Sequence, residues 1–211
     1  IKYSMNVVFI GTPEFAVPSL KCLIESKHDV AAVLTQTDKP KGRKGKPEAP
    51  PVKNIALDAG LQVIQPENVN SEQVIEELEK LSPDVIVVVA FGQKISDKIL
   101  NLPKHKCVNI HASLLPKYRG AAPINWAVVN GEKETGITTI IMSNKMDAGD
   151  VIIRKSLTIG PEETAGELGN RLSRLGAETL LDSLTQIETG DAKYTQQDES
   201  LEIGRASCRE R

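Results

Sequence analysis

The sequence has few cysteines and no long apolar run, and both absences exclude classes of protein. Among its 211 residues, Cys22, Cys107 and Cys208 are the three cysteines, widely separated and without a CxxC or histidine-rich segment nearby. Neither a disulfide framework nor a metal site is therefore predicted. No apolar stretch is long enough to span a bilayer, and the N-terminal segment has no signal-peptide cleavage site, so we expect a cytoplasmic protein with no membrane partner.

The positive and negative charges of the chain nearly balance. The formal net charge is -2, with 40% hydrophobic and 26% charged residues. This composition is typical of a globular protein and excludes disordered and fibrous classes, while the small net charge indicates no particular partner. The length allows one substantial domain with an ordinary core.

Short apolar runs alternate with segments of helical spacing along the chain. The predicted strands are 5–11, 30–35, 61–64, 84–90, 107–111, 135–142 and 151–157. The predicted helices are 13–26, 52–59, 71–81, 121–131 and 164–188, and a long loop rich in Lys, Pro and Gly covers 37–51. This order predicts an α/β fold, a single domain with a doubly wound, mostly parallel sheet. Such sheets bind ligands at the carboxyl ends of their strands.

The turn after the first strand, "GTPEFAVPS", lies where a dinucleotide fingerprint would be found. It lacks the second and third glycines of G-x-G-x-x-G, so a nicotinamide cofactor is not predicted. Two interpretations remain. The segment is a tight strand-to-helix turn, or Thr12 to Phe15 border a substrate pocket.

The strand 107–111 carries two polar side chains at alternate positions near its end. Asn109 and His111 point to one face of the strand because side chains at i and i+2 do so. A carboxamide can donate hydrogen bonds to a developing oxyanion, and a histidine can donate a proton near neutral pH. Together they suit addition to a carbonyl carbon. The alternative is a structural pair, in which both side chains bond to nearby loops.

A carboxylate pair follows a later strand, in the segment "MDAGD". Asp150 directly precedes the strand 151–157 and is interpreted as a turn residue, which leaves Asp147 as the candidate partner of His111. No G-x-S-x-G elbow is present. Ser113 is close to His111 in sequence but has no glycine-built elbow around it, so a covalent mechanism is not predicted.

Three segments, "VVFIGTPEFAVPSL", "NIHASLLPKYRGAAPI" and "MDAGD", resemble the folate-dependent formyltransferases, and among them the methionyl-tRNA formyltransferases, from about Met5 to Leu201. The resemblance implies a Rossmann-like domain that transfers a formyl group from 10-formyltetrahydrofolate, without a metal, to the amine of methionyl-initiator tRNA. It implies catalytic roles for Asn109, His111 and Asp147. The implied folate-binding residues are Ser113, Leu114, Leu115 and Pro116, with Phe91, Gly92 and Ile95 as further candidates.

The loop 37–51 concentrates positive charge on a slightly acidic chain. Taken alone, such a charge run is a solvated loop or a phosphate-binding patch whose contribution falls with salt. The resemblance implies that this loop contacts tRNA, which makes Lys41, Arg43 and Lys44 the candidates, with Arg43 foremost.

The resemblance also implies a division of the chain. Residues 5–189 are expected to form the catalytic domain, and 190–201 a linker toward a second, smaller domain. Residues 202–211 show no apolar periodicity, and we interpret them as a vector-derived tail. We expect a monomer that binds folate without the second domain but needs it for efficient tRNA formylation. The alternatives are a glycinamide ribonucleotide or sugar-nucleotide formyltransferase, and a non-catalytic RNA- or nucleotide-binding module.

Overall fold

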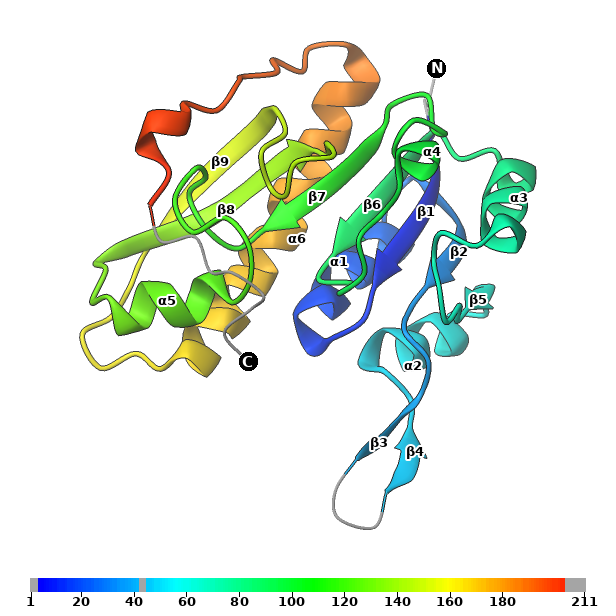
Figure 1. Cartoon of the computed structure of the whole chain (residues 1–211), viewed down its shortest axis with the longest axis horizontal. Coiled ribbons are helices and arrows are strands. Elements are labelled where there is room, and N and C mark those ends of the chain that lie inside the picture. Colours follow the sequence, from blue (N-terminus) through cyan, green and yellow to red (C-terminus); the bar gives the residue numbers. More distant parts are fainter. Residues whose placement is uncertain (1–3, 42–44, 204–211) are drawn as a thin grey trace. The chain divides into compact units, whose positions relative to one another are not determined.

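The computed structural model describes residues 4–41 and 45–203 (Figure 1). The chain divides into two compact units, Ile1–Cys107 and Val108–Arg211.

The first unit contains a parallel sheet. Its strands are β1 (Asn6–Gly11), β2 (Asp29–Leu34), β5 (Val63–Ile64) and β6 (Val85–Val89), in the order β5-β2-β1-β6. All three strand pairs are parallel. Every residue of β6 is buried, as is every residue of β1 after the first. These strands read as unbroken apolar runs because both faces of a parallel sheet are covered.

Helices of the first unit flank this sheet. They are η1 (Glu14–Ala16), α1 (Val17–Glu25), α2 (Pro51–Asp58), α3 (Glu72–Leu81) and α4 (Asp97–Leu100). The predicted helix 13–26 thus begins with a 3-10 turn before α1. The sequence did not predict α4, because four residues are too few to show helical periodicity.

The prediction of a loop at 37–51 was partly wrong, because this segment contains a hairpin. Strands β3 (Lys39–Lys41) and β4 (Lys46–Glu48) pair antiparallel, with Pro40 opposite Pro47. The prolines and glycines concealed the strands, since both residue types are depleted in sheets. The hairpin projects from the rest of the first unit (Figure 1).

The base of the hairpin is fixed by the Asp38 carboxylate. It accepts hydrogen bonds from Lys53 Nζ at 2.8 and 2.9 Å and from Gln65 Nε2 at 2.8 Å. The bonds from Gln65 and then Lys53 lower the pKa of Asp38, since they favour its ionised form.

The second unit contains an antiparallel sheet. Strands β7 (Cys107–His111), β8 (Glu134–Ile141) and β9 (Val151–Thr158) lie in the order β7-β8-β9. Helices α5 (Pro123–Val129) and α6 (Ala165–Thr189) and the 3-10 helix η2 (Glu199–Leu201) complete the unit. The α/β class with a mostly parallel sheet is confirmed, and the antiparallel pairs β7-β8 and β8-β9 belong to this second unit.

Helix α6 packs against β8 and β9 (Figure 1). It begins with a capping box, in which the side chains of Thr164 and Glu167 each accept a hydrogen bond from the backbone N–H of the other. Of the six leucines of α6, Leu168, Leu172, Leu180 and Leu184 are buried, and Leu175 and Leu181 are half-buried. No helix in the described ranges has the length and apolar character needed to cross a membrane.

Candidate functional site

The end of β7 brings Asn109 and His111 beside β8. In the antiparallel register Asn109 lies opposite Ile140 and His111 opposite Thr138. Asn109 is half-buried, and His111 is only 6% exposed. A buried imidazole needs hydrogen-bond partners on its ring nitrogens, so its surroundings decide its protonation and its use.

His111 is oriented by a backbone carbonyl. Its Nε2 lies 2.9 Å from the carbonyl oxygen of Tyr118, and because a carbonyl can only accept, Nε2 carries a hydrogen and donates it. The other ring nitrogen, Nδ1, lies 3.6 Å from Asp147 Oδ2, beyond hydrogen-bond length but within ion-pair range. Nδ1 is therefore the ring nitrogen that remains for a substrate.

Asp147 lies in the loop between β8 and β9, with its backbone in the left-handed region at φ 50. Its Oδ2 accepts a hydrogen bond from Gly120 N at 2.8 Å, and its Oδ1 lies 3.5 Å from Asn109 Nδ2. The structure thus brings Asn109, His111 and Asp147 together. Asp150 is exposed, and its carbonyl oxygen accepts from Ile141 N at 2.9 Å, as in a structural turn.

A glycine shapes the loop that carries Asp147. A Cβ added to Gly149 would lie 1.7 Å from the carbonyl oxygen of Ile141, at the end of β8. No real contact is that short, so only glycine lets the loop return so closely to the strand that it leaves.

The loop after β7 buries most of its predicted folate-binding side chains, against β8 and β9 as well as within the loop itself. Ser113 is fully buried, and its Oγ donates to the carbonyl of Lys117 at 2.6 Å. Thr138 Oγ1 donates to the carbonyl of Ser113 at 2.6 Å and accepts from Leu115 N at 3.1 Å. Leu115 packs with other buried apolar side chains, and Pro116 is buried after a cis peptide bond. Leu114 alone of these four is half-exposed.

The remaining predicted residues belong to the first unit. Phe91 and Ile95 are buried in its core, and Gly92 is exposed, with φ at 86. The carbonyl of Phe91 accepts a hydrogen bond from the Gln36 side chain at 2.6 Å.

The predicted tRNA-binding residues are only partly described by the structure. Lys41 is the last residue of β3. Arg43 and Lys44 lie outside the described residues.

Tyr118, which the sequence did not single out, anchors the loop that orients His111. Its hydroxyl donates to Glu132 Oε1 at 2.7 Å and accepts from Asn130 Nδ2 at 3.0 Å. Burial raises the pKa of Tyr118, so the hydroxyl stays protonated and able to donate. The ring is thus fixed at its far end, and the carbonyl that meets His111 Nε2 is fixed with it.

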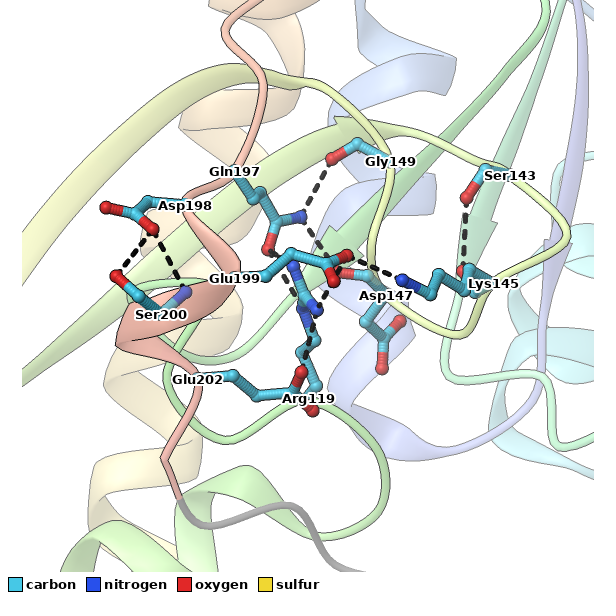
Figure 2. A network of polar contacts seen from close by, with 10 residues as sticks. All are labelled: Arg119, Ser143, Lys145, Asp147, Gly149, Gln197, Asp198, Glu199, Ser200 and Glu202. Atoms are coloured by element: carbon cyan, nitrogen blue, oxygen red, sulfur yellow. Dashed lines mark hydrogen bonds and ion pairs between the residues drawn. The ribbon is translucent and has the colours of Figure 1, made fainter.

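Gln197 binds the backbone beside Asp147, and Arg119 binds Gln197; both side chains are buried (Figure 2). Gln197 Nε2 donates to the carbonyls of Asp147 and Gly149, at 2.8 Å each. Its Oε1 accepts from Arg119 Nε at 3.0 Å and from Nη2 at 2.8 Å. No local pattern pointed to Gln197, because it lies 50 residues after Asp147 in a segment predicted to be a linker.

This arrangement has a definite chemical capacity. An amide N–H₂ and an imidazole nitrogen can stabilise a developing oxyanion, and a carboxylate beside the imidazole can balance its positive charge. Within 4–41 and 45–203, no three His, Cys, Asp or Glu side chains gather as metal ligands would.

Comparisons with known proteins place the chain in a family. Residues 5–184, which span both units, match one family model, described as formyl transferase. The methionyl-tRNA formyltransferase of Geobacter metallireducens is 51% identical over 197 residues, which are 93% of this chain and 63% of that protein. The one from Caldanaerobacter subterraneus is 52% identical over 187 residues, or 88% and 60%. The chain thus spans less than two thirds of the length of these curated relatives.

Solved structures show the same fold at low identity. Glycinamide ribonucleotide transformylase 1 from Symbiobacterium toebii superposes with a TM-score of 0.76 at 16% identity, covering 94% of this chain and 96% of that one. The sugar 3N-formyl transferase WlaRD, solved with dTDP and 5-N-formyl-THF, gives 0.69 at 21% identity, covering 95% and 70%.

Proposed function

Because this chain belongs to the formyl transferase family, we propose that it transfers a formyl group from 10-formyltetrahydrofolate to the α-amine of methionyl-initiator tRNA. The observation that carries the proposal is the convergence of Asn109 and His111 on the carboxylate of Asp147. The choice of acceptor is supported by relatives named methionyl-tRNA formyltransferase at about half identity. Their greater length makes the activity of the whole protein part of the proposal.

In the proposed reaction, the free amine attacks the formyl carbon directly. The N–H groups at Asn109 Nδ2 and at protonated His111 Nδ1 donate hydrogen bonds to the formyl oxygen as negative charge builds on it. Tyr118 keeps the ring oriented for this because its carbonyl occupies Nε2. Asp147 balances the charge of the doubly protonated imidazole and helps to move the proton from the attacking nitrogen to the leaving nitrogen.

The formyl donor is a substrate that the loop after β7 would contact. Since Ser113 bonds within the loop and Leu115 packs against Ile140 and Val151, the contacts to the donor fall to the half-exposed Leu114 and to backbone groups of residues 113–116. The residues Phe91, Gly92 and Ile95 are proposed as further donor contacts in the first unit. Buried Phe91 and Ile95 would shape such a contact, and the exposed backbone at Gly92 would make it.

The hairpin is proposed to bind the tRNA acceptor. Lys41, Arg43 and Lys44 would contact phosphates, and the projection of β3 and β4 from the first unit suits such an arm (Figure 1). The anchored hairpin base supports this role, because a fixed base lets an arm present charge in a defined direction.

A formyl-transfer assay against three acceptors tests the proposal. The purified chain is given labelled 10-formyltetrahydrofolate with methionyl-initiator tRNA, glycinamide ribonucleotide or a nucleotide-linked amino sugar. We expect label in the tRNA, with a rate that falls as salt rises, because phosphate contacts release counterions. Label in the ribonucleotide or the sugar instead would transfer the proposal to that acceptor. Label in none of the three acceptors would favour the alternative of a non-catalytic binding module.

The role of His111 is tested in the same assay with His111→Ala. We expect the rate to fall by about 10² or more, the range for an acid–base or oxyanion-stabilising group. His105→Ala is the matched control, since this histidine follows α4 in the first unit. A folded His111→Ala protein as fast as the control would overturn the assignment.

A further inference from the structure

Asp147 adopts a backbone conformation that a residue with a side chain does not favour. Its φ of 50 lies in the left-handed region, which costs a non-glycine residue roughly 1 kcal/mol or more. This conformation turns the carboxylate toward His111 and Gly120 and the carbonyl toward Gln197. Figure 2 shows the two groups of Asp147 pointing apart. Neighbouring groups must hold such a conformation in place.

Gln197 supplies that support with both hydrogens of its amide. Nε2 donates to the carbonyls of Asp147 and Gly149, so the backbone on both sides of Ala148 is fixed by one side chain. Gln197 is only 5% exposed, and water therefore competes little for these bonds. The amide cannot flip, because its Oε1 accepts two hydrogen bonds from Arg119.

Arg119 links this support to the other side of the site. Its neighbours in the chain are Tyr118, whose carbonyl meets His111, and Gly120, whose N–H meets Asp147. The guanidinium is only 3% exposed, and a buried charge of this kind is held in one geometry by its partners. A shift of Arg119 would therefore move both the carbonyl that meets His111 and the N–H that meets Asp147.

The partners of Arg119 come from the segment after α6. Besides Gln197 it donates to Glu202 at 2.9 Å, and Glu199 lies 3.8 Å away (Figure 2). The backbone of this segment is fixed too, since Thr195 and Val151 exchange N–H···O bonds of 2.8 and 2.9 Å. The segment predicted to be a linker thus packs against the loop that carries Asp147.

We propose that Gln197, oriented by Arg119, is a positioning residue that sets the placement of Asp147 against His111. The proposal rests on the proposed function, since it concerns how the reacting groups are aligned. Gln197 acts through the backbone of Asp147 and need not touch a substrate. Misalignment of a catalytic group by about 1 Å can lower a rate by about 10².

The test is the substitution Gln197→Glu in the full chain. Glutamate has the same shape and still accepts from Arg119, but it presents an oxygen to the carbonyls of Asp147 and Gly149 and loses both donations. Gln196→Glu is the matched control, the same change at the neighbouring, exposed position. We expect Gln197→Glu to lower kcat by about 10- to 100-fold relative to Gln196→Glu. KM for the formyl donor should change less than threefold.

A double-mutant cycle with Asp147→Asn separates positioning from a general structural role. If Gln197 acts through Asp147, then Gln197→Glu slows the wild-type protein but slows Asp147→Asn little further. Equal slowing in both backgrounds would overturn the proposal. So would a Gln197→Glu protein with the kcat of the Gln196→Glu control.

Failure of the proposed function has a different outcome, in which Asp147→Asn alone leaves the rate unchanged. A thermal midpoint for each variant reports folding independently. If Gln197→Glu does not fold, Arg119→Lys replaces it in the cycle. A lysine keeps the charge but cannot give two donors to Gln197 Oε1, and the same pattern of coupling to Asp147 is expected.

Discussion

Replacing Asp147 by asparagine removes one charge from the site while keeping its shape. The asparagine oxygen can take the place of Oδ2 and still accept from Gly120 N. The amide nitrogen then takes the place of Oδ1, 3.5 Å from Asn109 Nδ2, so that two donors face each other. The change is therefore expected to preserve the fold and to disturb the electrostatics of the reacting groups.

The size of the effect follows from the distance between the charges. At 3.6 Å and an effective dielectric of about 20, a carboxylate and an imidazolium attract by roughly 5 kcal/mol before desolvation is subtracted. Each 1.4 kcal/mol, approximately, changes a rate tenfold. The full attraction thus sets a ceiling between three and four powers of ten. Desolvation lowers the net value, so we expect kcat to fall by about 10² to 10³.

The assay is formyl transfer at saturating substrates, with Asp150→Asn as the matched control. Asp150 lies in the same loop and is exposed, so its charge is screened by water. We expect the control to retain the wild-type rate. A folded Asp147→Asn protein whose kcat stays within threefold of the control would show that the carboxylate contributes nothing to the reaction and would refute this reasoning.

Two further predictions concern the fold. Gly149→Ala forces a Cβ against the carbonyl of Ile141, so the free energy of unfolding measured in urea should fall by about 3 kcal/mol or more, and an unchanged midpoint would contradict this. Burial raises the pKa of Cys107 to about 12. At pH 8 its thiolate fraction is then about 10⁻⁴, so mass spectrometry should find Cys107 unalkylated by iodoacetamide until the protein unfolds, and rapid native labelling would contradict its burial. Because this folded pKa is raised, the associated stability is present below pH 9, the ordinary thiol value, and is lost as pH rises toward 12.

Most of the elements could be predicted from the sequence because their apolar patterns are strong. The unbroken run in β6 and the leucine spacing of α6 each have one physical interpretation, and the structure agrees with both within one or two residues. The hairpin and α4 escaped prediction because they are short. Their strand pairing and helical turn depend on neighbours in space more than on their own composition.

The grouping of Asn109, His111 and Asp147 was predictable because each residue follows or ends a strand. Asn109 and His111 share a face by the two-residue period of β7, and Asp147 follows β8. The groups that hold them were not predictable. The groups at Tyr118 and Gly120 are a backbone carbonyl and a backbone N–H, which nearly every residue type has, so the sequence does not reveal them. Gln197 is brought to the site only by the path of the chain after α6.

The hairpin has a consequence for association between molecules. Pro40 and Pro47 face each other across its two strands, and neither has an N–H to donate. An exposed two-stranded arm would otherwise offer its edges to a passing strand from another copy. The paired prolines, with the charged pair Lys39 and Glu48 beside them, make this arm a poor template for aggregation.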